Sequence, residues 1–322
     1  MAKKKRNKFN EAINKAEMFE MGATKRRIGP LKKNKILNHL KPVEKYFTEL
    51  MKEYETEFSY DIMAEEMPHF ITINYTEYAT CFIMMPVNLE LRERQMREAY
   101  NTNRPTDDFY EYFRNNVLSK DVNKYKDRED STAKYQPREV VAVLPGSNKL
   151  KERTCLNKLQ HIANEHKGNF YFKPHPITQH VFIGELKDRF GEENILPRDS
   201  DLYLYLTRAE KVYTTHISES ALYSAVLEKD FEPMDVYNKI SHGSFFHINS
   251  HLFRNQATGN SQETWINYTF SGFESGVINP KVDRDWKDKM EKYLDYIHNE
   301  RALYRNWYID KRKPRGKGNP IV

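Results

Sequence analysis

A lysine and a histidine alternate with two prolines in the segment Lys173-Pro174-His175-Pro176, directly at the end of a stretch expected to form a β-strand. Proline fixes its own φ angle, so the backbone beyond the strand has little freedom. Cationic side chains held in this way can donate hydrogen bonds to phosphate oxygens. We therefore expect Lys173 and His175 to bind a phosphate group. A proline-rich strand exit with a partly exposed histidine is the structural alternative.

A second segment, Thr214 to Ala221, places hydroxyl side chains where a strand gives way to a helix. Free backbone N–H groups at the start of a helix bind anions, and hydroxyls add further donors. The hydroxyls of Thr215, Ser218 and Ser220 are among the groups of this segment that could bind a phosphate. Glu219 is expected to grip a ribose hydroxyl. Ordinary N-capping by Ser218 is the structural alternative.

A third segment, Pro145-Gly146-Ser147, follows the first strand of the same region. Gly146 has no Cβ atom and permits close approach of the backbone to a ligand. Gly146 and Ser147 are therefore further candidates for the same anion site. A simple β–α turn would account for them equally well.

These three segments lie in a region where expected strands and helices alternate. Alternation of this kind predicts an α/β fold, with a parallel sheet and helices on both of its faces. The expected strands cover residues 139–144, 169–173, 194–196, 211–214 and 229–232, and the expected helices cover residues 149–166, 178–190, 201–207 and 218–227.

The rest of the chain has a different pattern. A helix is expected over residues 31–54, with Pro42 as a candidate kink. Further expected elements are strands at 69–75 and 79–85, helices at 88–100 and 106–117, a polar linker at 118–136, a loop at 242–269 and a final helix at 283–307. This pattern predicts an acceptor-side domain with a basic helical extension (1–136), a donor domain (137–280), and a C-terminal helix with a basic tail (281–322) that returns to the first domain.

The composition is that of a polar globular protein. The 322 residues are 39% hydrophobic and 30% charged, a length for about two domains. The two cysteines are far apart in sequence, which favours a reducing cytoplasm. No apolar run approaches the ~18 residues that a membrane helix needs. Two Asp-x-Asp patterns, at 199–201 and 283–285, fall where helices are expected to begin, so we interpret them as caps and expect no metal site.

The charge is concentrated at the two ends of the chain. Residues 1–52 hold 15 Lys and Arg against 5 Asp and Glu, and residues 301–322 hold 7 against one, within a net charge of +6. Basic ends suit a polyanionic partner, either nucleic acid or an anionic membrane surface. The nucleic-acid-binding candidates are Lys25, Arg26, Arg27, Lys32 and Lys33. A solvated tail is the alternative for the first residues.

The sequences VVAVLPGSNK, FYFKPHP and YTTHISESALYSAVLEKDFEP together resemble the C-terminal half of the GT-B glycosyltransferase superfamily. The first is similar to a loop of lipid A disaccharide synthase, and the second to the His-Pro motif of bacterial sialyltransferases and capsule or teichoic-acid transferases. The third departs from the superfamily's donor motif, because Glu228 stands where glycine is usual and Phe231 follows where an apolar residue and proline are common. The resemblance covers roughly 100 residues.

The resemblance implies two Rossmann-like domains facing a cleft, with a helix-rich N-terminal part. It further implies a nucleotide-sugar co-substrate, most simply a UDP-sugar, held without a metal or another cofactor. An inverting transfer also needs a base that deprotonates the acceptor. We expect that base in the N-terminal half, where Asp61, His69 and Glu77 are candidates.

The basic ends suggest the acceptor. Phage enzymes of GT-B fold glycosylate hydroxymethylated bases in DNA, so a DNA acceptor in the host cytoplasm is the first expectation. The second is a lipid-linked glycan reached by docking on an anionic membrane surface. A nucleic-acid-binding protein with a vestigial donor fold, and a sugar-nucleotide epimerase, are the remaining alternatives.

Overall fold

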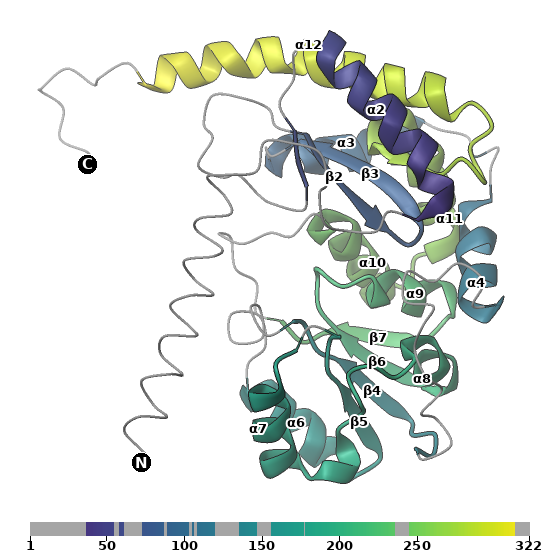
Figure 1. Cartoon of the computed structure of the whole chain (residues 1–322), viewed down its shortest axis with the longest axis vertical. Helices are drawn as coiled ribbons and strands as arrows, with labels where there is room; N and C mark the ends of the chain where they lie inside the picture. The colour runs from purple at the N-terminus through teal and green to yellow at the C-terminus, as the bar shows by residue number, and fades with distance from the viewer. Residues whose placement is uncertain are drawn as a thin grey trace, which may run out of the picture.

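The computed structural model describes residues 37–54, 58–60, 73–86, 89–102, 105, 108–119, 135–146, 156–176, 178–235 and 245–312. Its strands form two four-stranded sheets, which lie one above the other in Figure 1. Several predicted site residues lie outside the described residues: Lys25, Arg26, Arg27, Lys32, Lys33, Asp61, His69 and Ser147.

The second sheet is parallel throughout. It consists of β4 (Val140–Val143), β5 (Phe170–Lys173), β6 (Lys211–Thr214) and β7 (Asp230–Pro233), in the order β5-β4-β6-β7. A single bridge from Ile195 to Phe172 extends it beyond β5. Four of the five expected strands of this region are confirmed within one residue, and at 194–196 only the bridge at Ile195 forms. β4 and β5 are short apolar runs bounded by polar or turn residues, which made them easy to place.

Helices cover both faces of this sheet. On one face, α6 (Leu156–His166) and α7 (His180–Phe190) bury Leu159, Phe182 and Leu186 against β4 and β5. The other face packs against α8 (Leu202–Arg208) and α9 (Ser220–Val226). Asp201 caps α8 by accepting a hydrogen bond from the backbone N–H of Tyr203 at 3.0 Å, as predicted. The predicted α/β fold with a parallel sheet is therefore confirmed, and it is compatible with a Rossmann-like fold.

The first sheet is mixed. It has the order β1-β2-β3-β8, with β1 (Phe58–Tyr60) parallel to β2 (Ile73–Tyr78) and with β3 (Cys81–Pro86) antiparallel to both β2 and β8 (Val277–Ile278). The described strands therefore do not show the parallel arrangement expected of a second Rossmann-like domain. The strand expected from residue 79 begins at Cys81 instead, because Ala79 and Thr80 form a tight turn with φ angles of 46° and 68°.

The helices around the first sheet come from both ends of the described chain. After the short turn η1 (Asn38–Leu40), α2 (Lys41–Glu53) and α12 (Trp286–Arg312) cross the face shown at the top of Figure 1. Phe47, Met290 and Tyr293 are buried together there. Pro42 lies in the first turn of α2 and so begins this helix instead of kinking a longer one.

The opposite face of the first sheet packs against α3 (Leu89–Thr102), α4 (Phe109–Ser119), α10 (Phe246–Thr258), α11 (Gln262–Ser271) and the short turn η4 (Phe273–Ser275). The predicted loop over 242–269 was wrong, since α10 and α11 occupy most of it. Gly259, with φ 69°, ends α10, and Ser261 caps α11 by accepting from the N–H of Thr264 at 3.1 Å.

One continuous apolar core joins the two sheets. Tyr78 and Ile83 of the first sheet belong to the same cluster as Val212 of β6 in the second sheet and Leu222 of α9, and Ile248 of α10 is also a member. In the part of the chain that is described, no helix combines the length and the hydrophobicity needed to span a bilayer.

Candidate functional site

The strand order of the second sheet reverses between β4 and β6. β4 comes first in the chain, β5 lies on one side of it, and the chain then crosses to place β6 on the other side. The loops that leave the carboxyl ends of β4 and β6 therefore diverge, and doubly wound sheets bind their ligands at this position. We call these two strand ends, residues 144–146 and 214–220, the switch point. Gly146, Thr215, Ser218, Glu219 and Ser220 of the sequence prediction all lie there.

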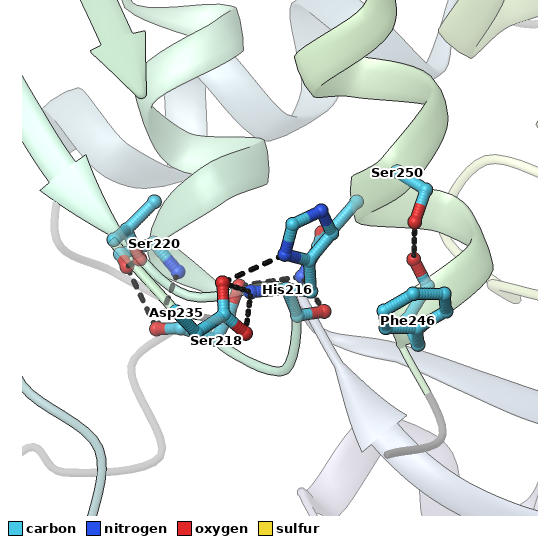
Figure 2. Close-up of polar contacts among 8 residues, drawn as sticks. His216, Ser218, Ser220, Asp235, Phe246 and Ser250 are labelled. Atoms are coloured by element: carbon cyan, nitrogen blue, oxygen red, sulfur yellow. Dashed lines mark hydrogen bonds and ion pairs between the residues drawn. The ribbon is translucent and has the colours of Figure 1, made fainter. Parts of the chain in front are cut away.

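A histidine–aspartate pair lies at the switch point. His216 Nδ1 is 2.7 Å from Asp235 Oδ1, and the backbone N–H of His216 donates to the same carboxylate at 3.1 Å and 3.3 Å (Figure 2). The Asp235 side chain is 1% exposed and that of His216 is 14% exposed. A buried carboxylate in this position acts as an acceptor, so His216 carries its proton on Nδ1.

The loop that carries His216 is held in place by Asn249 of α10. The Asn249 side chain is fully buried, and its Nδ2 donates to the carbonyl oxygens of His216 at 2.7 Å and Ser218 at 2.9 Å. Its Oδ1 accepts from the hydroxyl of Tyr78 at 2.6 Å. Burial, with the negative charge of Glu219, raises the pKa of the Tyr78 phenol well above its ordinary value, so that it is a neutral donor. The first sheet thus positions the loop after β6.

Hydroxyls at the start of α9 form a small network. Ser220 Oγ is hydrogen-bonded to Thr214 Oγ1 and, at 2.7 Å, to Ser218 Oγ. Ser218 Oγ also accepts from the N–H of Ser220 at 3.3 Å, but the N-cap position of α9 is Glu219 and has no side-chain cap, so Ser218 does not take the capping role considered for it. Thr215 Oγ1 is buried and has no hydrogen-bond partner among the described residues. A buried hydroxyl without a partner is uncommon in proteins and indicates a place where a ligand or water can bind.

The two cationic residues at the end of β5 differ from each other. Lys173 is 2% exposed, and its ammonium group donates to the carbonyl oxygens of Pro174 at 3.0 Å and Arg198 at 2.8 Å. Its charge is therefore used to hold the loops after β5 together, which favours a structural role over the expected phosphate contact. His175 is half-buried, beyond the end of β5 and next to the switch point.

The candidate base Glu77 lies away from this position. It belongs to β2 and is 5% exposed. Side chains alternate along a strand, so Glu77 shares a face with Tyr75, which packs against Phe47 of α2. Tyr78, on the opposite face, is the residue of β2 that reaches toward the switch point.

Sequence reasoning missed His216, Asp235 and Asn249. His216 and Asp235 each follow a strand end by two residues, and those strands, β6 and β7, are parallel neighbours. Because carboxyl ends of adjacent parallel strands meet at one edge, this spacing could have brought the pair to attention. Asn249 carried no such signal, since its segment was expected to be a loop.

Glu228, which stands where the superfamily motif usually has glycine, adopts a backbone conformation typical of glycine. Glu228 follows α9 with φ 56°, in the left-handed region that glycine adopts most easily. The chain therefore has the backbone conformation that the glycine of the superfamily motif would favour, although it carries another residue there.

Comparison with protein-family models and with curated proteins finds no match for this chain.

Proposed function

We propose that this chain is a metal-independent glycosyltransferase of GT-B type that moves a sugar from a nucleotide-sugar donor to a hydroxyl acceptor. The observation that carries the proposal is the position of Gly146, Thr215, Ser218 and Ser220 at the switch point of a parallel sheet flanked by helices on both faces. Hydroxyl groups at such strand ends suit a phosphorylated nucleotide.

In this proposal the donor phosphates lie against the ends of β4 and β6. The buried hydroxyl of Thr215 and the hydroxyl of Ser218 donate to phosphate oxygens, and half-buried His175 approaches from the end of β5. Hydrogen bonds that strengthen as the diphosphate departs lower the barrier without a metal ion. A UDP-sugar is the first donor to test.

The remaining elements take the acceptor side. The first sheet, with α2 and α12 packed on it, stands opposite the switch point and contacts it through Tyr78 and Asn249. A mixed sheet in this place differs from a second Rossmann-like domain, so the GT-B assignment rests on the donor half alone.

The proposed acceptor is a hydroxymethylated base in DNA. Its support is the excess of 15 Lys and Arg over 5 Asp and Glu in residues 1–52 and of 7 over one in residues 301–322. Basic segments bind phosphates, and a base in a duplex must be flipped out before its hydroxymethyl group can react.

A thermal-shift screen with UDP-, GDP-, CMP- and ADP-sugars tests the donor site. A ligand at about 100 times its Kd stabilises the folded chain by about 2.7 kcal/mol, which raises the melting temperature. We expect one nucleotide class to give this shift. Ser218→Ala weakens it, whereas Thr258→Ala does not, because the exposed Thr258 hydroxyl bonds only within α10. No shift with any nucleotide sugar, together with no donor turnover, would refute the proposal.

The acceptor is tested by measuring sugar transfer to hydroxymethylated duplex DNA. Unmodified DNA and lipid-linked glycan in anionic vesicles serve as parallel substrates. Product on the hydroxymethylated DNA only, with affinity falling between 50 and 200 mM salt, is the expected result. Product on the vesicles only would replace DNA by the membrane-bound acceptor.

A further inference from the structure

The His216–Asp235 pair has the hydrogen-bonding pattern of a proton-transfer group. Asp235 accepts from both the ring Nδ1–H and the backbone N–H of His216. The ring therefore has its lone pair on Nε2, and among the described residues Nε2 makes no hydrogen bond. A carboxylate placed behind Nδ1 stabilises the imidazolium that forms when Nε2 takes a proton.

The imidazole ring is also fixed in orientation. Phe246 stacks on it, with ring centroids 5.1 Å apart and an interplanar angle of 29°, and Phe253 lies at 4.7 Å. Figure 2 shows the ring between Asp235 and α10. Asn249 holds the carbonyl of His216, and Tyr78 holds Asn249. A base acts efficiently when it is held in one position, and here the ring, the backbone and the carboxylate are each held.

We infer that His216 is the general base of the transfer reaction and that Asp235 is its positioning residue. This inference rests on the proposed function. Nε2 takes the proton of the acceptor hydroxyl while the acceptor oxygen forms a bond to the anomeric carbon of the donor. The bond from that carbon to the phosphate oxygen breaks, and the nucleoside diphosphate leaves with the electron pair. The imidazolium then returns its proton to solvent.

The location of the pair favours a base over a second phosphate ligand. The loop of His216 contacts the first sheet through Asn249 and Tyr78, so its ring lies on the side of the switch point that faces the proposed acceptor half. The buried Glu77 lies on the other face of β2 and cannot serve from there. Base-assisted attack opposite the leaving group inverts the anomeric configuration, so the product of an α-linked donor is expected to be β-linked.

The experiment compares His216→Ala and Asp235→Asn with the wild type, using the nucleotide sugar that gives the largest thermal shift. Donor turnover is measured with water and with the acceptor, donor affinity by calorimetry, and folding by melting temperature. We expect kcat to fall by about 10²- to 10⁴-fold in His216→Ala with donor affinity within about twofold, and imidazole in the buffer to restore part of kcat. In Asp235→Asn the amide oxygen still accepts the backbone N–H while its NH₂ group faces Nδ1. The proton then moves to Nε2, and kcat falls without loss of fold.

His161→Gln is the matched control. His161 stands on the exposed side of α6 with Glu165 3.3 Å from its Nε2, so it is a histidine–carboxylate pair away from the switch point. The kcat of His161→Gln should equal that of the wild type. If His216→Ala keeps the wild-type kcat, or if its activity falls only because donor binding is weaker, the inference is overturned. Either outcome leaves the proposed function intact. Absence of donor binding and turnover in the wild type itself would overturn the proposed function, and the inference with it.

Discussion

Glycine at position 228 is expected to make the protein more stable than alanine at the same position. Glu228 has a φ angle of 56°, a conformation that costs a residue with a Cβ atom roughly 1–2 kcal/mol. Glycine removes this strain, but its greater freedom in the unfolded chain offsets about 0.5–1 kcal/mol of the gain. The balance favours glycine over alanine at this position by about 0.5–1 kcal/mol.

The side chain of Glu228 contributes little of its own. It is 68% exposed and forms an ion pair with Arg114 at 3.3 Å, a kind of pair that contributes roughly 0–1 kcal/mol. Its contact with the Tyr110 hydroxyl, at 3.4 Å, is long. Glu228→Ala loses the same contacts as Glu228→Gly but keeps the Cβ atom. The difference between the two variants therefore isolates the backbone term.

Urea unfolding measures this difference. Glu228→Gly should unfold at a higher urea concentration than Glu228→Ala with the same dependence on denaturant, and Arg114→Ala measures the contribution of the ion pair by itself. Equal midpoints for the glycine and alanine variants would show that the left-handed conformation costs nothing here, and the explanation of the motif departure would fail.

Three further predictions concern buried polar groups. Lys173→Met should lower the free energy of unfolding by about 1–3 kcal/mol, because it leaves the carbonyl oxygens of Pro174 and Arg198 unpaired. The affinity for the nucleotide sugar, measured by calorimetry, should change by less than about twofold. A loss of more than about tenfold would restore the expected phosphate role of Lys173. Asn249→Leu should lower the free energy of unfolding by about 2–4 kcal/mol and reduce kcat, and an unchanged urea midpoint would contradict its clamping role. Burial lowers the pKa of His247 below 6.5, against the opposing effect of Glu93. As the pH falls, the unfolded chain therefore takes up a proton on His247 before the folded chain does, so the stability should decrease from pH 7 to 5.5. The decrease should be smaller in His247→Gln, measured by urea unfolding. Parallel stability profiles of the two proteins would exclude His247 as the source of the decrease.

The parallel sheet was predictable because local and global patterns agree there. Val140–Val143 is a run of four apolar residues ending before Pro145 and Gly146, and Phe170–Phe172 ends before Lys173 and Pro174. A strand buried on both faces has no alternation to obscure it, so the apolar run and the turn residues are enough to place it.

The helices α10 and α11 were not predictable in the same way. The buried side of α10 includes His247, Asn249 and Asn255 beside its apolar residues. These polar side chains break the hydrophobic period on which a helix prediction depends. Their burial is explained only by partners elsewhere in the chain, such as Glu93 of α3 for His247 and Tyr78 of β2 for Asn249.

The same argument applies to the candidate site residues. Gly146, Thr215 and Ser218 have residue types that suggest phosphate binding wherever they follow a strand. Lys173 has such a type too, yet carbonyl oxygens of two neighbouring loops surround its ammonium group, and no local pattern reports them.

The pair that the further inference concerns is 19 residues apart in sequence and depends on strand pairing for its existence. Thr214 and Pro233 are partners in the register of β6 and β7, and each is followed two residues later by one member of the pair. A slip of that register would separate the ring from its carboxylate, since each residue of slip moves a strand end by about 3.3 Å and turns its side chains to the other face. The register is set in turn by Val212 and Phe231, which are paired with each other and buried in the core shared by both sheets. The chemistry proposed for His216 therefore depends on apolar residues that carry none of it, and substitutions at Val212 or Phe231 act on the site through the strand register.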